Sequence, residues 1–237
     1  MQLNTSNDAI NGDPTVRKTQ TIELGVFLFL ILSWIGSSFF VITGQVHLHF
    51  IGAAVSSIVS DLSLLCLVLY LVWRNGESFR RIGWTRTKWG GEIGWGMVLF
   101  LPAVIGANAL EQALRALGLS APSKLPSFLS ATGVGGIILA CVLVVVVAVV
   151  EETVFRGYLI LRIRTVTRRT SLAVVLSSVV FSLGHGYEGT AGVISVFVLG
   201  VVFALIYVWR KSLIAPMVMH FLTDFTSIVL VAFLRSQ

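Results

Sequence analysis

Long apolar stretches, separated by short polar and basic segments, recur along almost the whole chain. A helix needs roughly 20 residues to cross a hydrocarbon core of about 30 Å. Read with a window of about 19 residues, the pattern predicts membrane-spanning helices near residues 24–43, 51–73, 93–110, 133–155, 171–187, 191–209 and 213–234. The segment 111–130, with Pro122 and Pro126, is expected to be a loop or a short interfacial helix, so an eighth membrane element could lie there.

The composition of the chain also favours a membrane protein. Its 237 residues are 56% hydrophobic and only 12% charged, whereas about 25% of the residues in a soluble domain are charged. Because hydrocarbon offers the backbone no hydrogen-bond partners, helices are the expected spanning element. We therefore predict an all-α, polytopic transmembrane bundle of 7 to 8 spans.

The pattern divides the chain into three regions. Residues 1–22 are polar and lack the basic start, short apolar run and cleavage site of a secretory signal, so a disordered cytoplasmic tail is expected. Residues 23–130 form an N-terminal transmembrane region. Residues 131–237 form a second transmembrane region, which contains most of the candidate functional residues described below.

Basic residues indicate the orientation, because Lys and Arg are in excess in short cytoplasmic loops. They gather after the second, fourth and sixth predicted spans, at Arg74, Arg80, Arg81, Arg86, Lys88, Arg162, Arg164, Arg168, Arg169, Arg210 and Lys211. We therefore expect a multi-pass membrane protein with its N-terminus in the cytoplasm. The net charge of +6 is concentrated in these loops and forms no surface patch, which argues against a nucleic-acid partner.

Charged residues also occur where lipid is predicted, at Asp61, Glu151, Glu152, Arg156 and Asp224. A charge at the bilayer centre costs about 2.5–3.5 kcal/mol on insertion scales, so each is a candidate functional residue by default. Glu152 and Arg156 are four residues apart, the favourable spacing for an ion pair on one helix face. Glu151 then points about 100° away around the helix, where it can face a neighbouring helix. Asp61 has no motif around it, and a structural or cavity-lining role is expected.

Three of the polar residues fall at similar depths. Counted at about 1.5 Å per residue from the cytoplasmic boundary, Glu151 lies roughly 16 Å deep, His185 roughly 21 Å and His220 roughly 14 Å. A carboxylate and two imidazoles can therefore meet at one level of the bundle, although hydropathy does not say which way their helix faces point. His220 and Asp224 share one helix face at a spacing of four. Pro216, one turn earlier, is expected to bend that helix.

The same residues form three short motifs in a fixed order. These are an EExxFRG string at Glu151, Glu152, Phe155, Arg156 and Gly157, an FxxxH from Phe181 to His185, and an HxxxD from His220 to Asp224. The set resembles the CPBP family of intramembrane proteases, also called the ABI or CAAX-protease family, which includes type II CAAX prenyl endopeptidases and bacteriocin-immunity proteins. Each motif is weak alone, and it is their order on three predicted helices, over roughly residues 140–235, that carries the resemblance.

The resemblance implies a helical bundle with a cavity in which a water molecule attacks a peptide carbonyl. By that analogy Glu151 is the general base and His185 helps to position the water. His220 and Asp224 would stabilise the oxyanion, and the pair Glu152–Arg156 would support the site.

Metal dependence is left open by the residue types. An ionised Asp224 accepts hydrogen bonds and donates none, so it is expected to orient His220 or to bind a cation. Glu151, His185 and His220 are suitable ligands for a divalent metal such as zinc, with a fourth position open for water. The HExxH helix of soluble metalloproteases is absent. Both a zinc mechanism and a glutamate mechanism therefore remain.

Together with the resemblance, the sequence predicts an intramembrane endopeptidase that cleaves a membrane-associated protein or peptide. A prenylated, CAAX-type substrate, a role in bacteriocin processing or self-immunity, and a location in a bacterial cytoplasmic membrane are what the resemblance implies. The expected partners are the lipid bilayer and a peptide or lipidated protein substrate. A rival hypothesis is a proton-coupled transporter in which the same acids and histidines relay protons. A third is an inactive family member that serves as a membrane scaffold.

Overall fold

The computed structural model describes residues 14–42, 49–85, 89–122 and 126–235, and these ranges contain helices and loops but no β-strand. The α-helices are α2 (Pro14–Ile42), α3 (Phe50–Arg74), α4 (Trp89–Ala116), α5 (Gly133–Glu151), α6 (Ile160–Thr167), α7 (Thr170–Leu183), α8 (Gly189–Arg210), α9 (Ile214–Asp224) and α10 (Val231–Arg235). Three 3₁₀ turns are η1 (Phe79–Ile82), η2 (Ser127–Leu129) and η4 (Gly186–Glu188), and two π-helical segments are η3 (Glu152–Leu159) and η5 (Phe225–Leu230).

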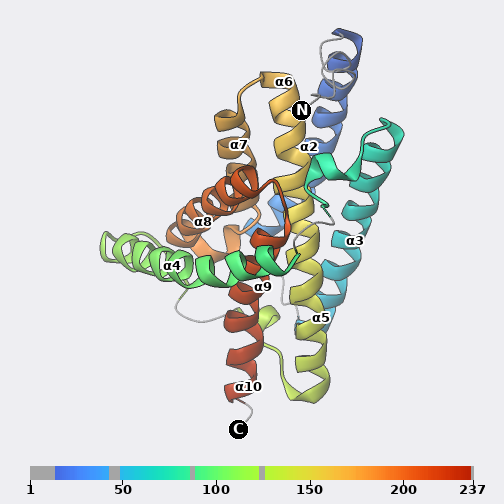
Figure 1. Cartoon of the computed structure of the whole chain (residues 1–237). Helices are drawn as coiled ribbons and strands as arrows, with labels where there is room; N and C mark the ends of the chain where they lie inside the picture. The colour runs from blue at the N-terminus through green and yellow to red at the C-terminus, as the bar shows by residue number, and fades with distance from the viewer. Residues whose placement is uncertain (1–13, 43–48, 86–88, 123–125, 236–237) are drawn as a thin grey trace.

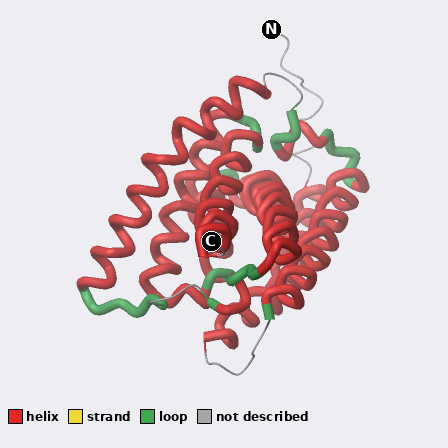
Figure 2. Tube along the Cα trace, turned by 90° about the horizontal axis from the view of Figure 1, so that it is seen from below, coloured by secondary structure: helices red, strands yellow, loops and turns green. Residues whose placement is uncertain are grey.

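The helices pack as one bundle around the predicted polar residues. α3 runs beside α5, α4 crosses α9 and α8, and α7 packs against α8 (Figure 1). Figure 2 shows the same helices from below, joined by loops. Large apolar side chains such as Val98, Leu101 and Ile105 on α4 point outward and are more than half exposed. Such a surface is suited to lipid and unsuited to water.

The protein is an integral membrane protein with fewer clear spans than predicted. Within the described residues, five helices are long and apolar enough to cross a bilayer: Phe50–Arg74, Trp89–Ala116, Gly133–Thr167, Gly186–Arg210 and Ile214–Leu234. Each predicted apolar segment is helical for most of its length. However, the 14 residues of α7 extend only about 21 Å at 1.5 Å per residue. The all-helical class is confirmed, and the count of 7 to 8 spans is not.

The N-terminal region begins differently from the prediction. Helix α2 starts at Pro14, so residues 14–22 are helical where a disordered tail was expected, and residues 1–13 lie outside the described residues. Proline is favoured at the first position of a helix because its fixed φ suits the helix and its missing N–H would have no partner there. Gln20 and Glu23 on this helix are buried, which explains why the polar segment is part of the bundle.

The fourth predicted span is also longer than expected. α5, η3 and α6 continue one another from Gly133 to Thr167, beyond the expected end at residue 155. Arg162, assigned to a basic loop by the sequence, is completely buried and forms ion pairs with Glu23 (Nε–Oε1 3.1 Å) and Glu77 (Nη2–Oε2 2.6 Å). Two acids from other parts of the chain thus compensate its charge, and no hydropathy pattern reports such partners. Arg164, two residues further along the helix, is exposed.

Candidate active site

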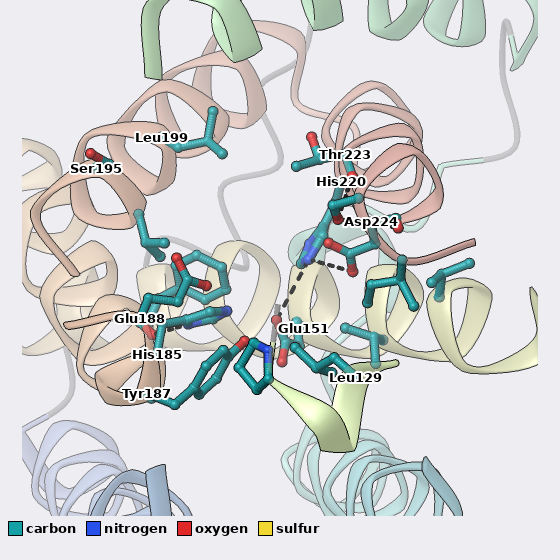
Figure 3. Close-up of a pocket in the computed structure, with 18 of the residues that line it drawn as sticks. Leu129, Glu151, His185, Tyr187, Glu188, Ser195, Leu199, His220, Thr223 and Asp224 are labelled. Carbon is teal, nitrogen blue, oxygen red and sulfur yellow. Dashed lines mark hydrogen bonds and ion pairs between the residues drawn. The ribbon is translucent and has the colours of Figure 1, made fainter. Parts of the chain in front are cut away.

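A pocket of about 590 Å³ opens between α3, α4, α5, α8 and α9. The predicted residues Glu151, His185, His220 and Asp224 all line it (Figure 3). Apolar side chains from α4, α5 and α8 form much of the remaining wall, including Val104, Leu143, Val144, Val147 and Leu199. The convergence that similar depths had suggested is therefore present in the tertiary structure.

Glu151 and His220 form the centre of the site. Their side chains come from α5 and α9, and His220 Nε2 lies 3.7 Å from Glu151 Oε2. Both residues are more than nine-tenths buried, with 8% and 5% of their surface exposed. The same Nε2 lies 3.5 Å from Asp224 Oδ2, one turn along α9. Two carboxylates thus face one imidazole nitrogen at the pocket wall, as the dashed lines in Figure 3 mark.

The other ring nitrogen of His220, Nδ1, is bound by Glu152. This nitrogen lies 2.8 Å from Glu152 Oε1, and because an ionised carboxylate only accepts, Nδ1–H donates this hydrogen bond. The same oxygen lies 2.9 Å from Arg156 Nη1, which confirms the ion pair predicted from the spacing of four. Glu152 therefore orients the imidazole and neutralises the arginine. The sequence predicted the second contact but had no means to predict the first, which joins residues 68 positions apart.

Arg156 is packed between aromatic rings. Its guanidinium carbon lies 4.2 Å from the ring centroid of Phe181 and 5.4 Å from that of Phe203. Cations are attracted to the faces of aromatic rings, most strongly when the charge is desolvated, and Arg156 is only 1% exposed. Phe181 also lies beside His185, with ring centroids 4.7 Å apart. One aromatic ring thus contacts both the supporting pair and a site histidine.

His185 lies just beyond the end of a helix and not inside a span. α7 ends at Leu183, four residues before the predicted end, because Gly184 and Gly186 flank the histidine and the chain turns into η4. His185 Nδ1 is 3.0 Å from the carbonyl oxygen of Phe181, which can only accept, so Nδ1 carries the proton of this hydrogen bond. In the neutral imidazole, Nε2 is then a hydrogen-bond acceptor. Such a group can bind a water molecule by accepting one of its protons.

Two π-helical segments flank the site. η3 begins immediately after Glu151, and η5 begins immediately after Asp224. π-helical turns are rare and occur often at functional sites. They widen the helix, so the direction of each side chain differs from the simple α-helical rotation used for the sequence prediction. In both helices the change of geometry occurs next to a carboxylate that lines the pocket.

The structure corrects the prediction that Pro216 bends its helix. α9 begins at Ile214, which makes Pro216 its third residue. The first N–H groups of a helix have no partner within the helix, so a proline at this place removes no hydrogen bond. The irregularity in this helix is instead η5, beyond Asp224.

Comparison with known families adds an independent observation. Residues 133–226 match the family model described as Type II CAAX prenyl endopeptidase Rce1-like. The chain carries an Rce1-like domain. This confirms the resemblance drawn from the three motifs, and the matched segment includes Glu151, His185, His220 and Asp224. No curated protein and no solved structure matches the chain.

An Rce1-like domain points to a CAAX-type protease that works in a membrane, and so to a hydrolase. It begins with α5 and ends in η5, so the helices that contribute the candidate residues belong to it. A transporter that uses the same acids and histidines is not favoured by this match. The walls contributed by α3 and α4 lie outside the matched segment.

The metal hypothesis can be compared with the arrangement of donors in the Rce1-like domain. Among the described residues, no three His, Cys, Asp or Glu side chains are grouped closely enough to hold a metal ion. Glu151, His185 and His220 therefore do not form a ready-made zinc site in this conformation. Zinc binding by these three residues stays a prediction.

Several residues that line the pocket were given no catalytic role by the sequence. Asp61 on α3 lines the pocket, which confirms one of the two roles expected for it. Glu188, Tyr187, Glu111 and Arg115 also line it, from segments that the sequence treated as loops or span ends. An acid such as Glu188 beside a predicted span was a usable signal. Glu111 and Arg115, which belong to α4, could be found only once the packing of α4 against the Rce1-like domain was known.

Proposed function

We propose that this protein is an intramembrane endopeptidase in which Glu151 activates a water molecule for hydrolysis of a peptide bond. The observation that supports this most is the position of Glu151. Its carboxylate is buried, faces a pocket inside a membrane bundle, and lies 3.7 Å from an imidazole that a second glutamate orients. The Rce1-like family of residues 133–226 supports the same reaction class.

In the proposed reaction, a carboxylate oxygen of Glu151 accepts a proton as the water oxygen bonds to the carbonyl carbon. The carbonyl oxygen becomes an oxyanion, which His220 stabilises by donating a hydrogen bond from Nε2–H. In this step His220 is an imidazolium with a proton on each ring nitrogen, because Nδ1–H already donates to Glu152, and the carboxylates of Glu151, Glu152 and Asp224 around the ring favour that charge. Glu151 then returns the proton to the amide nitrogen as the carbon–nitrogen bond breaks. The products are a carboxylic acid and an amine, and Glu151 ends in its starting state.

The remaining residues act on this pair in distinct ways. His185, with its proton on Nδ1, accepts a hydrogen bond from the water at Nε2 and positions it. Glu152 and Arg156 hold His220 in the orientation that presents Nε2 to the pocket. Asp224, when ionised, keeps the proton on Nε2 of His220 by accepting from it.

The apolar walls support a substrate that is itself membrane-bound. A prenylated chain or an apolar segment of a peptide can occupy the space beside Val104, Leu143 and Leu199. Such walls also limit the number of water molecules near the reacting bond. We propose a CAAX-type lipidated protein or a membrane peptide as the substrate class, the second of which includes bacteriocin-like peptides.

The test is cleavage of a fluorogenic prenylated CAAX peptide and an apolar membrane peptide by the purified protein in liposomes. Glu151→Gln keeps the shape of the side chain and removes the base, so we expect cleavage to fall by at least about a hundredfold. Glu92→Gln is the matched control, because Glu92 is also buried and paired, with Arg210 at 2.7 Å, but does not line the pocket. Undiminished cleavage by the Glu151→Gln protein would overturn the assignment.

A further inference from the structure

The pocket wall contains more acids than the proposed reaction uses. Its carboxylates are Asp61, Glu111, Glu151, Glu188 and Asp224, and Arg115 is its one Lys or Arg side chain among the described residues. Arg115 is already bound to Glu111, with Nε and Nη2 at 3.0 and 2.5 Å from the same oxygen. Glu151 and Asp224 face His220. The pocket therefore has an excess of negative charge beyond the catalytic pair.

Asp61 is a buried acid of this pocket that the proposed reaction does not use. It is 7% exposed, yet it lines the pocket. Among the described residues it forms no hydrogen bond and no ion pair. It belongs to α3, outside the segment that matches the Rce1-like family. A buried acid in a membrane helix needs a partner or a function, and no residue that the structure describes forms a hydrogen bond or an ion pair with Asp61.

The face of α3 that leads to Asp61 is lined by small side chains. Ala53, Ala54 and Ser57 border the pocket at one to two turns from Asp61 on the same helix. A long flexible side chain can lie along such a surface and place its terminal group beside the carboxylate. Lys and Arg have this form, with an apolar stem and a cationic end.

We propose that Asp61 is a specificity residue that binds a cationic side chain, lysine or arginine, of the peptide substrate near the bond that Glu151 cleaves. The proposal rests on the proposed peptidase function and adds the substrate class. The apolar walls hold the stem of that side chain, and Asp61 provides the counter-ion. A metal cation is a poorer occupant, because no group of three or more ligating side chains is present among the described residues.

Binding can be measured separately from cleavage in the Glu151→Gln protein. The probes are polyleucine peptides of about 20 residues that carry one lysine at successive positions, each matched to the same peptide with norleucine. We expect at least one lysine peptide to bind about tenfold more tightly than its norleucine match, as a desolvated charge pair should. Adding Asp61→Asn, which keeps the size of the side chain, should abolish this preference.

Ser60→Asn, added in the same way, is the control. Ser60 is the neighbouring residue on α3, is exposed and does not line the pocket, so the lysine preference should persist. Equal binding of every lysine and norleucine pair, or a preference that survives Asp61→Asn, would overturn the subsite. Cleavage by the protein with native Glu151 is scored with the same peptides. A lysine preference in binding without any cleavage would instead reject the peptidase proposal and leave the subsite intact.

Discussion

Glu152 shows how one residue can support a site without facing the substrate. One of its oxygens accepts a hydrogen bond from His220 and lies 2.9 Å from Arg156, and all three side chains are buried. Removing one partner from a buried ion pair leaves an uncompensated charge in a medium of low dielectric constant. Arg156 should therefore matter for stability and, through the orientation of His220, for activity.

Replacing Arg156 tests this coupling. Arg156→Met should destabilise the protein by about 3–5 kcal/mol, because it leaves Glu152 without its cation, and it should lower kcat more than it raises KM. Arg156→Lys keeps the charge but loses the planar group between Phe181 and Phe203, so its loss should be smaller. Denaturant unfolding in detergent and peptide-cleavage kinetics give the two measurements. If Arg156→Met and Arg156→Lys lose equal amounts of stability and of kcat, the charge of Arg156 is not its decisive contribution to either.

At the scale of elements, the π-helix η3 depends on one close backbone approach. A Cβ built on Gly157 would lie 2.6 Å from the carbonyl oxygen of Ile82 and 3.2 Å from its Cβ. Ile82 ends η1 and is itself fully buried. The glycine of the EExxFRG string therefore allows η1 to pack directly on the helix that continues from Glu151.

Gly157→Ala is predicted to disturb this contact. The backbone of η1 would have to move, and overpacking of this kind costs about 1–3 kcal/mol. Gly135→Ala on α5 is the matched control, since nothing lies within 4 Å of a Cβ at that position and alanine favours a helix over glycine. Thermal unfolding in detergent should show a lower Tm for the first variant only. A Gly157→Ala protein as stable as the Gly135→Ala protein would rule out a steric role.

At the scale of the whole molecule, a buried polar network joins the N-terminal helix to the rest of the bundle. Arg162 pairs with Glu23 of α2 and with Glu77, which follows α3. Tyr158 donates to Glu23 at 2.7 Å, and Asn75 donates to the second oxygen of Glu23 at 2.8 Å. No described residue of α2 lines the pocket. The network should therefore affect the stability of the folded bundle more than the rate of peptide cleavage.

Arg162→Met should lower the free energy of unfolding by about 3–5 kcal/mol because two buried acids lose their cation. Arg164→Met, two residues along the same helix and exposed, is the control and should change it by less than about 0.5 kcal/mol. At temperatures where both variants remain folded, cleavage per folded molecule should match that of the native protein. A large fall in kcat for Arg162→Met, without a loss of stability, would contradict a purely structural role of the network.

The sequence by itself determined those features that depend on residues close together in the chain. Apolar stretches predicted the helices, the spacing of four predicted the Glu152–Arg156 pair, and three short motifs indicated the Rce1-like domain. Such features follow from helix geometry and hydropathy, which need no knowledge of partners.

Only the tertiary structure decided which distant groups meet. It joined Glu152 to His220, supplied Glu23 and Glu77 as partners for Arg162, and turned Asp61 toward the pocket of the Rce1-like domain. Hydropathy states that a buried charge needs compensation but not which residue supplies it. That choice depends on the rotation and contact of whole helices, which are set by side-chain packing across the bundle.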